Sequence, residues 1–167
     1  MKKNLFAILA ADMFGYSRLM EHDEFDVITR QSQYLKEIIE PQISIGNGTV
    51  IKTTGDGFLA VFETVQQSVE SAIEIQTRIP GVEEPFPYER KIQYRMGINV
   101  GDVILSDNDV FGDSVNIASR LEGLSVPGGI CLSDIVYQLI NEDKKQLFKD
   151  LGSQRVKNIS RPIKVWQ

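Results

Sequence analysis

Two aspartates that each follow or interrupt a predicted strand could bind divalent cations together. Asp12 comes directly after the apolar run 5–11, and Asp56 lies between Gly55 and Gly57 at the tip of a predicted hairpin. Close carboxylates repel each other, and a cation between them relieves that repulsion. Oxygen ligands of this kind suit Mg²⁺ or Mn²⁺ held together with substrate phosphates. Taken singly, each aspartate is equally well explained as an ordinary turn residue.

The turn after Asp12 is a candidate phosphate-binding segment. Residues 13–17 lead from the strand end through Gly15 into a predicted helix, so backbone N–H groups there can face phosphate oxygens. The segment lacks the Gly-x-x-x-x-Gly-Lys-Ser/Thr pattern of a P-loop. Gly15, Tyr16 and Ser17 are therefore candidate substrate contacts without a specific phosphate motif.

A third group of polar residues lies on a later predicted helix. Asn116 and Arg120 are four positions apart and therefore share one helix face. An amide and a guanidinium on one face could stabilise negative charge that develops on a phosphoryl group. The alternative is a solvated helix face on which Arg120 pairs with Glu122 or Asp113.

The elements that must position these residues follow from periodicity and breakers. The predicted elements are a strand at 5–11, a helix at about 24–40 ended by Pro41, a hairpin at 50–62, a helix capped by Thr64 and stopped by Pro80-Gly81, an exposed loop at 82–90, a strand at 92–105, a helix at 112–124, a strand at 130–132, a helix capped by Ser133 and short strands within 148–166. This order predicts an α+β fold with a ferredoxin-like βαββαβ core, C-terminal additions and an antiparallel-rich central sheet flanked by helices. We expect a single domain over 1–167, in which Asp12 and Asp56 converge at one sheet edge.

Composition excludes several classes of protein. Hydrophobic residues make up 42% of the 167 residues, and the net charge of −5 argues against a nucleic-acid-binding module. The single cysteine, Cys131, cannot form an internal disulfide and is expected in the core of a reduced, cytoplasmic protein. The N-terminal apolar run is interrupted by Asp12, unlike a signal peptide, and no run approaches the ~18 apolar residues needed to span a bilayer. His22 is expected on the solvated surface.

Several motifs in a fixed order resemble the catalytic domain of class III nucleotidyl cyclases, the adenylyl and guanylyl cyclase family. These are AADMFGYSRLM, KTTGDG, FGDSVNIASRLE and PGGI, and together they resemble the bacterial branch of the family across almost the whole chain. The resemblance implies that Asp12 and Asp56 bind two divalent cations, Mg²⁺ or Mn²⁺, with the Met13 carbonyl as a further ligand. It implies that Lys52 and Asp109 read the purine. Guanylyl cyclases of the family typically carry Glu and Cys there, so ATP is the implied substrate.

The resemblance also implies the reaction, which converts ATP to cyclic AMP and pyrophosphate. Asn116 and Arg120 match the two residues that act on the transition state. Lys157 is a further candidate contact for the terminal phosphates, with less motif support. The family assembles its sites between subunits, so a homodimer is implied, in which Asp12 and Asp56 of one copy face the other four side chains of its partner.

The chain departs from the family pattern in one place, and two alternative functions remain open. The connection from Gly101 to Asp109 is shorter than in mammalian-type members, which leaves dimer affinity open. Asp109 is preferred over Asp107 and Asn108 because it lies seven residues before Asn116. The alternative functions are a nucleotide-binding or dimerisation module that is catalytically weak or inactive, and a ferredoxin-like RNA-binding domain, for which no RNP-type motif is present. Covalently linked regulatory domains in a longer native protein are also expected.

Overall fold

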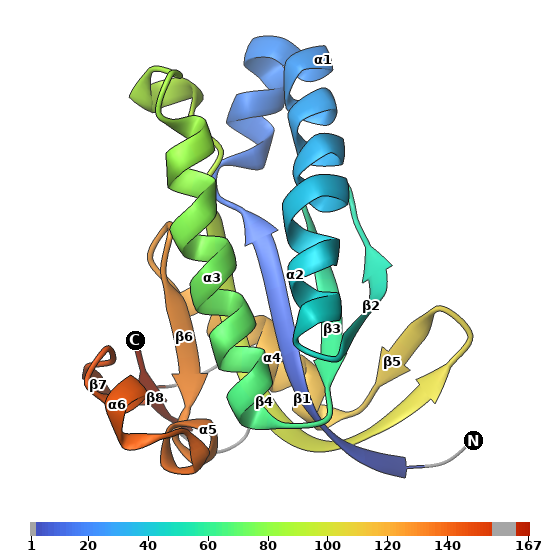
Figure 1. Ribbon diagram of the computed structural model, residues 1–167, viewed down its shortest axis with the longest axis vertical. Coiled ribbons are helices and arrows are strands. Elements are labelled where there is room, and N and C mark those ends of the chain that lie inside the picture. The colour runs from blue at the N-terminus through green and yellow to red at the C-terminus, as the bar shows by residue number, and fades with distance from the viewer. Residues whose placement is uncertain (1–2, 155–162) are drawn as a thin grey trace.

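The fold is built around one large sheet. A computed structural model describes residues 3–154 and 163–167 (Figure 1). The strands are β1 (Lys3–Met13), β2 (Gly48–Thr53), β3 (Gly57–Phe62), β4 (Tyr94–Ser106), β5 (Asp109–Phe111), β6 (Ile130–Ser133), β7 (Asp150–Gln154) and β8 (Ile163–Trp166). The helices are α1 (Tyr16–Tyr34), the π-helical turn η1 (Leu35–Ile39), α2 (Glu40–Ile45), α3 (Val65–Glu83), the 3₁₀ turn η2 (Tyr88–Arg90), α4 (Asp113–Leu124), α5 (Asp134–Leu139) and α6 (Glu142–Lys145).

The strand order confirms the predicted fold class. The sheet runs β2-β3-β1-β4-β6-β8-β7, with β5 paired to β4. Its first four strands are antiparallel to their neighbours in the ferredoxin-like order, and β6 joins β4 in parallel. The strands β6, β8 and β7 are the C-terminal additions, and they extend the sheet beyond β4, on the side away from the β2–β3 hairpin.

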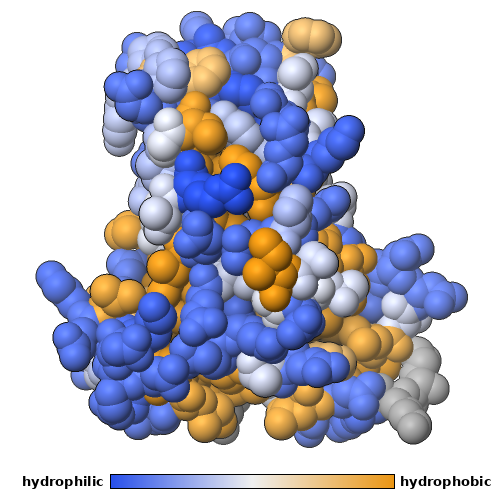
Figure 2. Space-filling view, in the orientation of Figure 1, coloured by the Kyte–Doolittle hydropathy of each residue, from blue (hydrophilic) through white to orange (hydrophobic). Residues whose placement is uncertain are grey.

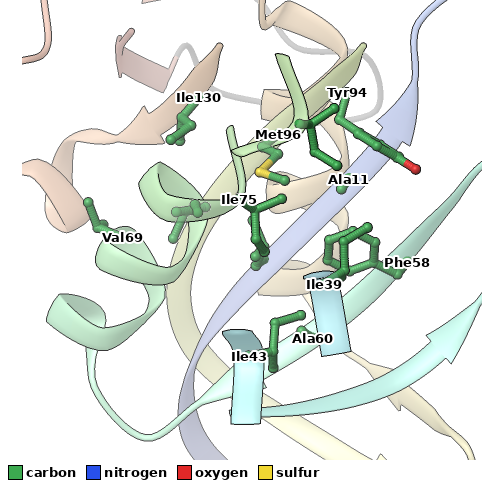
Figure 3. Close-up of a cluster of buried hydrophobic side chains, with 14 of the residues drawn as sticks. Ala11, Ile39, Ile43, Phe58, Ala60, Val69, Ile75, Tyr94, Met96 and Ile130 are labelled. Atoms are coloured by element: carbon green, nitrogen blue, oxygen red, sulfur yellow. The ribbon is translucent and has the colours of Figure 1, made fainter. Parts of the chain in front are cut away.

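Helices cover both faces of the sheet. The helices α1, α2 and α3 lie on one face and α4 lies on the other (Figure 1). Successive side chains of β1 point to opposite faces of the sheet and pack in both layers. Leu9 and Ala11 belong to the larger core, and Ile8 and Ala10 belong to the smaller cluster under α4. Figure 3 shows the larger core, where side chains from the sheet and from α3 meet.

The predicted end of the first helix at Pro41 is wrong. The helical run continues from α1 through η1 into α2, and Pro41 occupies the first turn of α2. The π-helical turn η1 directly precedes Pro41, so the regular i→i−4 hydrogen-bond ladder is already interrupted where the proline lacks its N–H. The run also starts earlier than predicted, at Tyr16, and it kinks at Asp23, where φ is −160° and ψ is 91°.

The predicted stop at Pro80-Gly81 is also wrong, because α3 includes Pro80 and extends to Glu83. The Glu83 carboxylate is buried and accepts hydrogen bonds from Arg30, at 2.7 Å, and from the hydroxyl of Tyr34. It also accepts the backbone N–H of Ile92. This network anchors the last turn of α3 beyond the proline.

Other local predictions are confirmed. The Thr64 hydroxyl accepts the backbone N–H of Gln67 at 3.1 Å, so Thr64 caps α3. Cys131 is fully buried and free, and burial raises the pKa of its thiol to about 12.

The helix-covered face in Figure 2 is largely hydrophilic, with small separate apolar areas. Among the residues that the structure describes, none of the helices could cross a bilayer.

Candidate active site

The two aspartates lie side by side because the hairpin tip packs against the end of β1. Asp12 pairs in register with Gly57, and the N–H of Met13 donates to the carbonyl oxygen of Asp56 at 2.6 Å. A Cβ on Gly57 would lie 1.9 Å from the carbonyl oxygen of Ala11, so this position requires glycine. The backbone therefore brings together two residues that are 44 positions apart in the chain.

Thr54 fixes the orientation of the Asp56 carboxylate. Its hydroxyl donates to Asp56 Oδ1 at 3.0 Å and accepts the N–H of Gly57 at 3.0 Å. The N–H of Thr54 also donates to the carbonyl oxygen of Gly57 at 2.9 Å, which closes the tip. No sequence motif indicated this role for Thr54.

Arg95 is the second residue at this site that the sequence analysis missed. It lies opposite Asp12 on β4 and forms a bidentate pair, with Nε 3.0 Å from Oδ1 and Nη2 2.7 Å from Oδ2. These hydrogen bonds raise the pKa of the guanidinium. A positive group thus already contacts both oxygens of Asp12.

Glu122 reaches the same place from α4, where a close approach of backbones positions it. A Cβ on Gly97 of β4 would lie 2.3 Å from the N of Glu122 and 2.4 Å from the carbonyl oxygen of Ala118. The Glu122 carboxylate lies 3.6 Å from Arg95 Nη2. Burial, and then the negative charge of Asp12, raise the pKa of Glu122 to about 8.

Asp12, Thr54, Asp56 and Glu122 border one open groove of about 300 Å³. Its lining residues are Ala10, Ala11, Asp12, Lys52, Thr54, Asp56, Phe58, Leu59, Ser119 and Glu122. Within residues 3–154 and 163–167, no three His, Cys, Asp or Glu side chains are arranged to hold a metal ion by themselves. A cation bound at Asp12 and Asp56 would therefore need further oxygens, such as those of a phosphate.

Lys52 and Asp109, the two predicted base-reading residues, form an ion pair. Lys52 Nζ lies 3.0 Å from Asp109 Oδ1, and both side chains are partly exposed. A bulge after Val50 shifts the register of β2 at Lys52, and a two-residue turn with Asn108 at φ 59° returns the chain to Asp109 on β5. The N–H of Val110 and then Lys52 lower the pKa of Asp109.

Of the residues that the structure describes, the others that were predicted for the site do not line the groove. Gly15 has a positive φ of 66° and immediately precedes α1, so Tyr16 and Ser17 begin the helix just after the end of β1. Asn116 and Arg120 both lie on α4, and neither is among the groove-lining residues. Lys157 lies outside the described residues.

Comparison with known proteins identifies the family. Residues 2–167 match the adenylate and guanylate cyclase catalytic domain. The chain belongs to this family. A crystal structure of an adenylate/guanylate cyclase/hydrolase from Silicibacter pomeroyi is 53% identical, with a TM-score of 0.89 over 99% of this chain and 96% of that one. An adenylyl cyclase from P. aeruginosa shares the fold at 24% identity and a TM-score of 0.81, over 100% of this chain and 95% of that one.

Curated relatives of this cyclase domain are longer proteins. A Rhizobium meliloti protein assigned as adenylate cyclase 3 is 42% identical over 99% of this chain and 28% of its own length. An adenylate cyclase from Glutamicibacter nicotianae is 27% identical over 83% of this chain and 33% of its own length. The chain therefore spans about a third or less of the length of these relatives. The resemblance inferred from the sequence motifs is confirmed at the level of the family.

Proposed function

We propose that this cyclase domain is an adenylate cyclase that converts ATP to 3′,5′-cyclic AMP and pyrophosphate. The observation that carries the proposal is the pair of adjacent carboxylates, Asp12 and Asp56, that line one open groove. In the reaction, the ribose 3′-oxygen bonds to the α-phosphorus, the bond from that phosphorus to the bridging oxygen breaks, and the hydroxyl proton is released. The names of the R. meliloti and G. nicotianae relatives support adenine nucleotide as the substrate.

The residues present suit two divalent cations, Mg²⁺ or Mn²⁺. Asp12, Asp56 and the carbonyl oxygen of Met13 would hold them, and these are the hard oxygen ligands that such ions prefer. The fit is supported by the main chain, which holds Asp12 and Asp56 next to each other at one groove. Arg95 contacts both oxygens of Asp12 and would have to release at least one of them to an ion. When bound, the ions would lower the pKa of the 3′-hydroxyl and offset charge on the triphosphate.

The Lys52–Asp109 pair would select the base. The Lys52 ammonium can donate to N1 of adenine, and the Asp109 carboxylate can accept from the exocyclic amine. Guanine presents an N–H at N1 and an oxygen at C6, so both interactions would be reversed. Because Lys52 and Asp109 already contact each other at 3.0 Å, their side chains are held close together before the base binds.

Asn116 and Arg120 would complete the site from a second copy of the chain. Arg120 would stabilise charge on the phosphoryl group and Asn116 would orient the ribose. We propose a homodimer with two equivalent sites, in which Lys52, Asp109, Asn116 and Arg120 of one copy face Asp12 and Asp56 of the other. Asn116 and Arg120 are absent from the lining of the groove around Asp12, which supports this division for these two residues. Lys52 does line that groove, so the β2–β3 hairpin would border both sites of the dimer.

The remaining contacts of the proposed site are to phosphate. The backbone N–H groups of Gly15, Tyr16 and Ser17 at the start of α1 would bind triphosphate oxygens, and Lys157 would contact the terminal phosphates. The greater length of the curated relatives supports a native protein in which this domain is linked to regulatory domains. We propose a cytoplasmic location for the domain, where ATP is available.

A cyclase assay across protein concentration tests the proposal. The protein is incubated with Mn²⁺ and either ATP or GTP, and cyclic nucleotides are separated chromatographically. We expect cyclic AMP production whose specific activity rises with protein concentration, and a loss of about 10²-fold or more in Asp56→Asn. A product yield equal to that of Asp56→Asn would contradict turnover, and a preference for GTP would contradict the base assignment.

A further inference from the structure

We propose that Glu122 is a positioning residue that draws Arg95 away from Asp12 when a divalent cation binds. The inference rests on the proposed function, because it assumes a cation at Asp12. It concerns a residue that the sequence analysis considered only as a surface partner of Arg120. The structure instead places Glu122 in the groove, beside Asp12 and Arg95.

Arg95 and a cation compete for the same two oxygens. Arg95 Nε and Nη2 lie 3.0 and 2.7 Å from the two oxygens of Asp12. A cation that binds Asp12 must take at least one of these oxygens, and it also repels the guanidinium. Metal binding at this carboxylate therefore requires Arg95 to give up part of the bidentate pair.

Glu122 is the acceptor to which Arg95 can turn. The Glu122 carboxylate is 3.6 Å from Nη2, the same nitrogen that bonds Asp12. Among the described residues, Asp12 and Glu122 are the ion-pair partners of Arg95 within 4.0 Å. A small shift of the guanidinium would thus exchange one acceptor for the other, and with Glu122 ionised it would leave no charge unpaired in a half-buried site.

The backbone keeps Glu122 in place while Arg95 moves. Its main-chain nitrogen lies against Gly97 of β4, and Asn99 of the same strand donates to the carbonyl oxygen of Ser114 at 3.1 Å, which ties the start of α4 to the sheet. Glu122 itself is less exposed than Arg95, with side-chain exposures of 13% and 27%. The fixed partner is therefore the carboxylate, and the guanidinium is the group that moves.

Binding of Mn²⁺ alone, measured by electron paramagnetic resonance of the free ion, tests this role without turnover. The variants are Glu122→Gln, Arg95→Met and the double variant, with Asp113→Asn as a control that removes an exposed carboxylate from the same helix. We expect Glu122→Gln to weaken Mn²⁺ binding about three- to tenfold, because Arg95 then stays on Asp12. Arg95→Met should strengthen binding, and adding Glu122→Gln to it should change binding less than about twofold.

Other patterns of Mn²⁺ binding would overturn the proposal. Equal weakening by Glu122→Gln with and without Arg95 would show that Glu122 acts on the ion directly and would overturn the proposal. Unchanged binding in Glu122→Gln, or the same change in Asp113→Asn, would also overturn it. Circular dichroism of each variant checks that it folds. If Asp12→Asn leaves Mn²⁺ binding unchanged, the proposed metal site itself is wrong, which separates failure of the proposed function from failure of the role of Glu122.

Discussion

Lys52 and Asp109 form an ion pair of 3.0 Å that joins β2 to β5, two strands that are not neighbours in the sheet. Each side chain therefore restrains the other. A substitution at one position changes the electrostatic environment of its partner, so the two residues have to be altered together if the base preference is to be changed without a repulsive contact.

The first prediction concerns this pair. Replacing Lys52 alone by Glu would place two carboxylates in contact, whereas Lys52→Glu with Asp109→Cys removes that repulsion. We expect the double variant to lose at least about 10²-fold in kcat/KM for ATP, since its hydrogen-bonding pattern no longer fits adenine. The measurement is the rate of cyclic AMP and cyclic GTP formation from equal concentrations of ATP and GTP. An unchanged preference for ATP would show that these residues do not read the base.

The second prediction concerns the division of the site between two copies. Asp12→Asn and Arg120→Ala should each be inactive alone. In a mixture, the heterodimer contains one site with an intact Asp12 from one copy and an intact Arg120 from the other. We expect the mixture to recover up to about a quarter of wild-type activity, because half of the dimers are mixed and half of their sites are intact.

A control keeps this result interpretable. Mixing Asp12→Asn with Asp56→Asn should recover nothing, since both substitutions affect the same half of a site. If the Asp12→Asn and Arg120→Ala mixture also stays inactive while size-exclusion chromatography shows exchanged dimers, all of these residues act within one copy.

The third prediction concerns stability and pH in the absence of divalent cations. Burial and the nearby Asp12 raise the pKa of Glu122 from 4.5 to about 8. The folded state then binds the Glu122 proton more tightly than the unfolded state does. This contribution to stability is fully present below pH 4.5 and is lost as the pH rises through about 8.

Urea denaturation of wild type and Glu122→Gln in EDTA, at several pH values from 5 to 9, measures this effect. We expect the free energy of unfolding of wild type to decline relative to that of Glu122→Gln as the pH rises. Asp113→Asn serves as the matched charge control. A constant difference between wild type and Glu122→Gln across this range would show that Asp12 and burial do not perturb Glu122.

The fourth prediction concerns the contact between α4 and β4. Gly97→Ala would push a Cβ to within 2.3 Å of the Glu122 nitrogen, so α4 must move away from the sheet. We expect a loss of about 3 kcal/mol in the free energy of unfolding, together with weaker Mn²⁺ binding as Glu122 is displaced. Gly123→Ala is the control, because a Cβ there meets no atom within 4 Å and should stabilise the helix by about 0.5–1 kcal/mol. Equal stability of the two variants would contradict the close approach.

The sequence was sufficient to predict the core fold and the meeting of Asp12 with Asp56. The elements follow from strand and helix periodicity, which is local, and their order implies that the hairpin tip pairs with the end of β1. Arg95 and Glu122 were missed because their role depends on pairing over long distances. Arg95 faces Asp12 across 83 positions, and only the register of β1 against β4 reveals it. A usable signal was present, however, since Arg95 is a charged residue between two side chains expected in the core, Tyr94 and Met96.

The helix ends were mispredicted for a related reason. Proline is a reliable local signal, but its cost can be offset by contacts elsewhere in the fold. Beyond Pro80, the buried Glu83 binds Arg30, Tyr34 and the N–H of Ile92, and none of these partners could be assigned from the sequence around Pro80. At Pro41, the preceding π-helical turn interrupts the regular hydrogen-bond ladder and so accommodates the missing N–H.

The contact of Gly57 with the end of β1 has a consequence for how this site can diverge. The separation of Asp12 and Asp56 is set by main-chain atoms. The carbonyl oxygen of Ala11 lies directly against Gly57, and the N–H of Met13 donates to the carbonyl oxygen of Asp56. The groove walls, by contrast, are built from side chains such as Lys52, Leu59 and Ser119. Substitutions can therefore accumulate in the walls, and with them new substrate preferences, while the spacing of the two carboxylates is inherited unchanged.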